Sequence, residues 1–169
     1  MNELKEHRSI IIFIFFVVPL VGSKAAAIFG IHDIGIIYGW KKFYSAALGR
    51  SNEYALAATL YLLMAPLAVI WINSMASFQG ISRIKASILS VGCAAVSFVL
   101  LCIIILGPPI SSIETPTQGM RFVISVGRSH AAFCAMYGAF VISFIATAYA
   151  SILIFFYLIK DIYKGMRDE

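Results

Sequence analysis

The chain has 169 residues, of which 61% are hydrophobic and only 12% charged, and its mean hydropathy is +0.92. Soluble domains carry about 25% charged residues, so this composition excludes an ordinary water-soluble globule, and its apolar content excludes intrinsic disorder. The net charge of +5 fits contact with anionic lipid headgroups better than nucleic-acid binding, which needs a concentrated basic face. We therefore expect a domain embedded in a bilayer.

The first predicted span covers residues 9–29 and contains a single charged residue, Lys24. Its apolar stretch at residues 10–22 follows Lys5 and Arg8, so the segment is also typical of a secretory signal peptide that is cleaved shortly afterwards. We favour an uncleaved span, because the apolar run continues beyond Lys24 and a lysine can extend its amine to the interface.

Three later segments, residues 55–75, 86–106 and 131–158, have no charged residue, and each reaches the roughly 20 residues needed to cross the hydrocarbon core. Pro66 predicts a local bend, and Asn73 is expected to pair with a neighbouring helix or to reach the interface. The expected fold is an all-α integral membrane protein with four transmembrane helices in an antiparallel bundle.

Four spans place both ends of this single domain, residues 1–169, on the same side of the membrane. Lys and Arg are slightly more numerous on that side, and the short basic turn at residues 79–85 belongs to it. Because short basic loops stay in the cytoplasm, we expect cytoplasmic termini in a bacterial inner membrane. The two longer loops, residues 30–54 and 108–130, then face outward.

The first outer loop surrounds two adjacent lysines with aromatic rings. Rings beside ammonium groups suit the membrane interface, so each outer loop has the composition for a short interfacial helix, but we favour a solvated connector with aromatic anchors. We expect this loop to recognise a partner through Trp40, Lys41, Lys42 and Arg50.

The last span carries a ridge of small side chains at every fourth position. Small residues let helix backbones approach closely, and close packing holds helices together where lipid already solvates large apolar side chains. We therefore expect the last helix to pack tightly against another helix along this ridge. The ridge consists of Ala131, Ala135, Ala139, Ser143, Thr147 and Ser151.

Few residues suggest catalytic, metal or transport chemistry. The last three spans lack Asp, Glu, Arg and His, the groups with which transporters and proton pumps bind their coupling ions. His32, Asp33 and His130 are candidates for a zinc or acid–base site, but adjacent residues point in different directions, so we expect satisfied interfacial histidines instead. We expect no catalytic residue, cofactor or metal. The cysteines lie in apolar runs and are expected to be buried thiols.

By elimination, the sequence favours a non-catalytic inner-membrane protein that contacts lipids and recognises another membrane-inserted protein or toxin. In size and number of spans the chain is similar to the small immunity and exclusion proteins of bacterial plasmids and phages. That similarity implies protection by protein–protein interaction, with residues 30–54 as the specificity region. One alternative is an accessory subunit of a secretion or respiratory complex, and another is a small oligomeric transporter or channel.

Overall fold

The computed structural model describes residues 2–31, 36–49, 53–73 and 82–167. The protein is 87% helical, and the described residues contain no strand, so the all-α expectation is confirmed. In chain order the elements are α1 (Asn2–Ile28), α2 (Gly39–Leu48), α3 (Tyr54–Leu63), α4 (Ala65–Asn73), α5 (Arg83–Leu106), the 3-10 helix η1 (Ile110–Ile113), α6 (Gln118–Gly127) and α7 (His130–Arg167).

Three of these helices are long and apolar enough to cross a membrane. They are His7–Ile28 within α1, Ile84–Leu106 within α5 and His130–Tyr163 within α7. The pair α3 and α4 passes the same test as one unit that is bent by 43°. The chain is therefore compatible with a helical membrane protein of three or four crossings, in the same segments that the sequence indicates.

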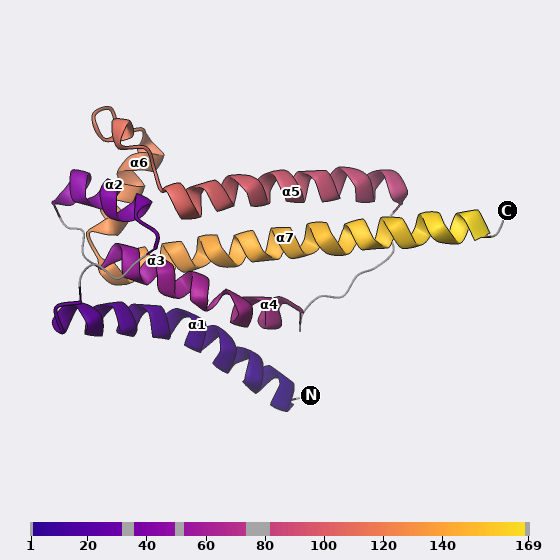
Figure 1. Ribbon diagram of the computed structural model, residues 1–169, viewed down its shortest axis with the longest axis horizontal. Helices are drawn as coiled ribbons and strands as arrows, with labels where there is room; N and C mark the ends of the chain where they lie inside the picture. The colour runs from indigo at the N-terminus through magenta and orange to yellow at the C-terminus, as the bar shows by residue number, and fades with distance from the viewer. Residues whose placement is uncertain (1, 32–35, 50–52, 74–81, 168–169) are drawn as a thin grey trace.

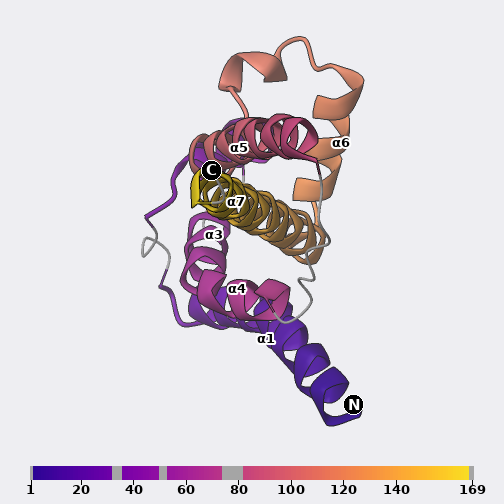
Figure 2. The same cartoon turned by 90° about the vertical axis from the view of Figure 1, so that its right-hand side faces the viewer.

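Helices α1 and α5 run in one direction along the longest axis of the molecule, and α7 runs in the opposite direction (Figure 1). Helix α7 is central, because it packs against α5 on one side and against α1, α3 and α4 on the other (Figure 2). Helix α5 packs extensively against α7, and in the described part of the chain it makes no comparable contact with α1, α3 or α4. The arrangement is therefore a group of α1, α3–α4 and α7, with α5 attached to the outer side of α7, rather than a closed bundle.

The bend between α3 and α4 lies beside Pro66, in the first turn of α4. Proline has no N–H to donate and its ring collides with the carbonyl one turn earlier, so a straight helix does not continue through it. The chain makes a tighter turn, in which the Leu67 N–H donates to the Met64 carbonyl at 3.0 Å. This confirms the expected bend. At the end of α4, Asn73 accepts a hydrogen bond from the Tyr149 hydroxyl of α7, as expected for a polar group paired with a neighbouring helix.

Small hydroxyl side chains join α5 to α7. The Ser97 hydroxyl donates to the Thr147 hydroxyl at 2.8 Å, and Ser90 and Ser151 donate to each other's backbone carbonyl at 3.2 and 3.1 Å. Such side chains let two backbones approach closely, and a hydrogen bond of this kind contributes about 0.6 kcal/mol on average between membrane helices. Two residues of the predicted ridge, Thr147 and Ser151, therefore do pack against another helix.

Helices α2 and α6 and the short η1 cover one end of the long helices, which we call the capped end (Figure 1). Both long loops thus contain short helices, which the sequence favours less than a solvated connector, and three of the first loop's aromatic rings are buried rather than at an interface. Trp40, Phe43 and Tyr44 of α2 are at most 1% exposed and belong to the core. The reason is a close backbone approach: a Cβ on Gly39 would lie 2.0 Å from the Leu106 carbonyl oxygen, so α2 lies directly on the end of α5.

Two tyrosines fasten α6 to the capped end. Tyr54 donates its hydroxyl to the Gly127 carbonyl at 2.6 Å, and Tyr44 donates to the Val123 carbonyl at 3.0 Å. Burial and the neighbouring Tyr54 raise the pKa of Tyr44, so its phenol stays protonated and keeps donating. A Cβ on Gly127 would lie 1.9 Å from the Tyr44 ring, so only glycine allows α6 to approach this closely.

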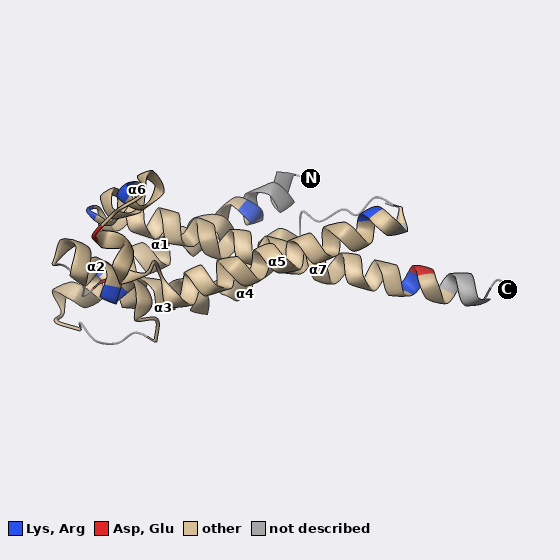
Figure 3. Cartoon of the chain, turned by 90° about the horizontal axis from the view of Figure 1, so that it is seen from above, with Lys and Arg blue, Asp and Glu red and all other residues tan. Residues whose placement is uncertain are grey.

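Charged residues lie at the two ends of the long helices, and the described residues between those ends carry none (Figure 3). The capped end holds Lys24, Lys41, Lys42, Glu53, Glu114, Arg121 and Arg128. The opposite end of α5 and α7 holds Lys85, Lys160 and Asp161, whereas Arg8 belongs to the start of α1, which lies nearer the middle of the longest axis (Figure 1). An uncharged layer between two charged ends is the distribution that a membrane-crossing orientation requires.

Candidate functional site

Polar side chains from three parts of the fold meet at the capped end, in a group that we call the polar junction. It consists of Ser23 and Lys24 of α1, Glu53 immediately before α3, and His130 and Cys134 of α7. The Glu53 carboxylate lies 2.8 Å from the Lys24 amine and 3.1 Å from His130 Nδ1. The other ring nitrogen, Nε2, lies 2.8 Å from the Ser23 hydroxyl and 3.5 Å from the Cys134 thiol.

Local helix structure positions each member of the junction. The Ser23 hydroxyl donates to the Pro19 carbonyl one turn earlier at 2.6 Å, so the side chain is folded against its own helix. Glu53 precedes the first turn of α3, where the helix dipole favours a negative charge. His130 is the first residue of α7, which places its ring between α1 and the start of α3.

Exposure decreases through the junction from the lysine to the histidine. The side chains of Lys24, Glu53 and His130 are 51%, 27% and 6% exposed. The buried imidazole of His130 shares a hydrogen bond with Ser23 through Nε2, whereas Nδ1 lies near the Glu53 carboxylate without a hydrogen bond to it. The exposed ion pair between Lys24 and Glu53 is worth at most about 1 kcal/mol, so its main effect is to compensate charge where three helices meet.

In the junction the Glu53 carboxylate contacts the His130 imidazole, and the imidazole contacts the Ser23 hydroxyl, as in a Ser–His–Glu catalytic triad. Ser23, however, has no exposed surface, and its hydroxyl already donates to the Pro19 carbonyl. It also lies inside α1, where its backbone N–H belongs to the helix and does not point at an oxyanion. The geometry therefore supports a junction that joins helices rather than a nucleophile presented to a substrate.

Reasoning from the sequence singled out His130 but not its partners, Glu53 and Ser23. A signal for Glu53 was present: Lys24 is the only charged residue of the first span, and Glu53 immediately precedes the second. Because consecutive secondary-structure elements are usually adjacent in space, the end of one span and the start of the next are expected to lie together. Nothing comparable in the sequence points to Ser23.

The residues predicted to recognise a partner have different environments. Trp40 is buried, and its indole N–H donates to the Ile103 carbonyl at 3.0 Å, so it is a core residue. Lys41 is half-buried, with its amine 5.8 Å from the centre of the Tyr38 ring, and Lys42 is exposed. Arg50 lies outside the described residues.

The predicted ridge of α7 is divided between two environments. Its last two residues, Thr147 and Ser151, contact α5 through the hydrogen bonds given above. Its first four residues are exposed, so no other part of the described chain covers them. They are Ala131, Ala135, Ala139 and Ser143.

No group of three or more His, Cys, Asp and Glu side chains within the described residues is arranged to hold a metal ion. His32 and Asp33 lie outside the described residues, so their predicted roles are untested. The cysteines are free thiols: Cys134 is buried, as expected, whereas Cys93 and Cys102 are half-buried.

No known protein family, curated protein or solved structure matches this chain.

Proposed function

We propose that the chain is an integral membrane protein with four transmembrane helices, and that it acts without catalysis by recognising another membrane-inserted protein. The spans are α1, the bent pair α3–α4, α5 and α7. The uncharged layer between two charged ends supports this orientation. The open packing of α5, which meets α7 on one side, leaves long apolar faces available in the bilayer.

The observation that carries the proposal is the contrast between two faces of α7. On one face Phe133, Tyr137 and Val141 are fully buried in the core. On the other face the first four ridge residues are small and exposed, from Ala131 to Ser143. Lipid contact alone favours large apolar side chains, whereas small residues on a helix surface allow a second helix to approach closely. The exposed ridge therefore fits a helix of another protein.

Protection against a pore-forming toxin or an entering genetic element is the concrete version that we favour, in a bacterial inner membrane with cytoplasmic termini. The partner's apolar segment would lie along the ridge, and exposed cations at the capped end, such as Lys42 and Arg121, would select it. The burial of Trp40 moves the selective surface away from the aromatic residues of residues 30–54. Replacement of that segment by a flexible linker would remove core residues and thus test folding rather than recognition.

The proposal is tested by placing a photo-crosslinking amino acid at Ala139 of the full-length protein, expressed in its native cells. An adduct with a second protein is expected at Ala139, and Ala95, an exposed alanine of α5, is the matched control position. In the double variant Ala135→Leu and Ala139→Leu, co-purification of the partner in mild detergent should be lost while far-UV circular dichroism stays unchanged. Equal crosslinking at both positions, or full co-purification with the double variant, would overturn the proposal.

The same exposed ridge also suits an accessory subunit of a larger membrane complex. A subunit would co-purify with stoichiometric partners from unchallenged cells, whereas a protective protein would do so only when its target is present. Transport is less well supported, because the described residues of the middle layer carry no charged group to bind an ion. Ion flux into liposomes that contain the purified protein would favour the transporter instead.

A further inference from the structure

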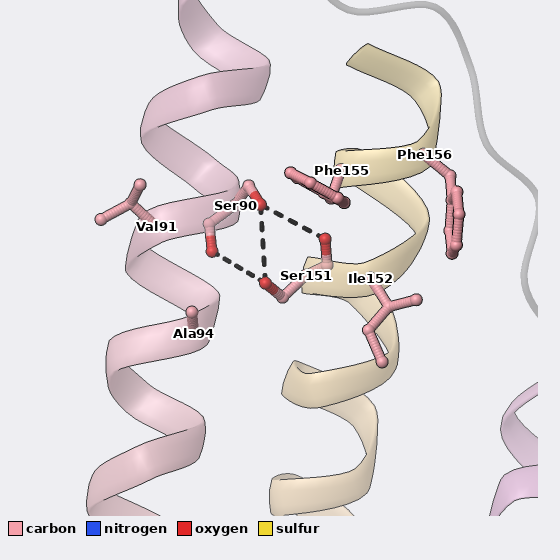
Figure 4. A pocket seen from close by; sticks show the side chains of 7 residues that line it. All are labelled: Ser90, Val91, Ala94, Ser151, Ile152, Phe155 and Phe156. Carbon is pink, nitrogen blue, oxygen red and sulfur yellow. Dashed lines mark hydrogen bonds between the residues drawn. The ribbon is translucent and has the colours of Figure 1, made fainter. Parts of the chain in front are cut away.

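A groove of about 500 Å³ lies between α5 and α7 (Figure 4). Its lining residues lie nearer to the start of α5 than to the capped end of the molecule. Ser90, Val91 and Ala94 line it from α5, and Ser151, Ile152, Phe155 and Phe156 line it from α7. The small residues Ser90, Ala94 and Ser151 leave the space, and the larger side chains around them are exposed.

The two serines in the groove have no free hydroxyl proton to donate to an occupant. Each hydroxyl donates to the backbone carbonyl of the other serine, and their oxygens are 3.5 Å apart (Figure 4). Their only proton donors are thus engaged between the two helices. Because the rest of the lining is apolar, the groove suits an apolar occupant without polar groups of its own, such as a hydrocarbon chain.

One basic residue of α7 follows the groove at one end. Ile152, Phe156 and Lys160 are spaced by four residues, so Lys160 lies one turn beyond Phe156 on the same face of α7, and it is exposed. Lys85 lies at the same end of α5, but five residues place it about 140° around the helix from Ser90, so it faces away from the groove. In the other direction along α5 and α7 no charged residue follows within the spans. The neighbouring Asp161 is half-buried and has an interaction of its own, whereas Lys160 is exposed.

We propose that the groove binds one acyl chain of an anionic phospholipid, whose phosphate headgroup is held by Lys160. The inference rests on the proposed membrane-spanning orientation but not on the recognition of a protein partner. An acyl chain satisfies the apolar lining, and an anionic headgroup satisfies the cation beyond it. A protein helix would satisfy the lining but would leave unexplained the position of the cation at one end of the groove.

The test uses full-length protein in nanodiscs that contain phosphatidylglycerol or phosphatidylcholine with a photoreactive group in the acyl chain. Crosslinks are expected mainly on residues 152–156 of α7 and on the α5 residues that face them. Ala94→Phe, which fills the groove, should greatly reduce these crosslinks, whereas Ala95→Phe, at the exposed neighbour outside the groove, should not.

Lys160→Gln should lower the preference for phosphatidylglycerol about fivefold, the factor that corresponds to about 1 kcal/mol per cation near an anionic surface. Lys42→Gln at the capped end is the control and should leave the preference unchanged. Equal labelling by both lipids, crosslinks spread over all exposed helix faces, or equal effects of the two alanine variants would overturn the proposal. A protein adduct to a photo-crosslinker at position 94 would also overturn it, independently of the result at Ala139.

Discussion

The Glu53 carboxylate lies 3.1 Å from His130 Nδ1 and so joins the start of α3 to the start of α7. The same carboxylate lies 2.8 Å from the Lys24 amine of α1, so one acidic side chain connects the three parts of the central helix group. Polar groups that leave water need partners. Loss of the Glu53 carboxylate would remove the charged neighbour of both the His130 ring and the Lys24 amine.

Glu53→Gln keeps the size of the side chain but removes its charge. We expect the free energy of unfolding to fall by about 1–3 kcal/mol, because the buried His130 ring loses a charged partner. Unfolding by sodium dodecyl sulfate from mild detergent, followed by far-UV circular dichroism, measures the change. The control is Glu114→Gln at an exposed position, where a change within about 0.5 kcal/mol is expected. A similar loss in both variants would contradict the role assigned to Glu53.

Gly127→Ala should destabilise the capped end, because its Cβ would lie 1.9 Å from the Tyr44 ring. We expect a loss of about 1–3 kcal/mol, the usual cost of overpacking a core contact. The matched control is Gly119→Ala in the same helix, where a Cβ meets nothing within 4 Å and greater helix propensity should stabilise the helix by about 1 kcal/mol. The same unfolding assay distinguishes the two, and equal effects would mean that α6 does not pack on Tyr44 in this way.

The hydrogen bond between Ser97 and Thr147 is expected to contribute to the docking of α5 on α7. In a double-mutant cycle of Ser97→Ala and Thr147→Val, the coupling should be about 0.6 kcal/mol, as is typical between membrane helices. Both residues also contact carbonyls of their own helices, so each single variant includes a local effect that the cycle removes. Additive single effects would show that the two side chains do not interact.

The proposed four-span orientation predicts which positions are accessible from the same side of the membrane. In a variant without the native cysteines, Cys introduced at Ser45 of α2 and at Ser125 of α6 should react with a membrane-impermeant thiol reagent from one side. Cys introduced at Lys160 of α7 should react from the other side. Reaction of all three positions from the same side of sealed vesicles would exclude the proposed orientation.

The positions of the long helices follow from local sequence. Uncharged runs of sufficient length predict the spans, and the missing N–H and the ring of Pro66 predict the bend between α3 and α4. The pairing of Asn73 with Tyr149 follows in part, since an amide in an apolar segment needs a partner, although the sequence does not name it. Each of these features depends on the composition of one segment, which is why the sequence alone predicts it.

The tertiary structure decides which surfaces of those segments meet. Tryptophan is a residue type that often anchors a chain at the membrane interface. Trp40 is nevertheless in the core, because Gly39 lets the backbone of α2 approach the end of α5 closely. The small-residue ridge predicts close packing, but only its end at Thr147 and Ser151 receives α5. The polar junction depends on contacts between residues far apart in the chain, and local hydropathy carries no information about such contacts. The sequence by itself therefore determines the helical class and the positions of the long apolar segments, whereas burial, pairing and the exposed faces depend on how the helices pack.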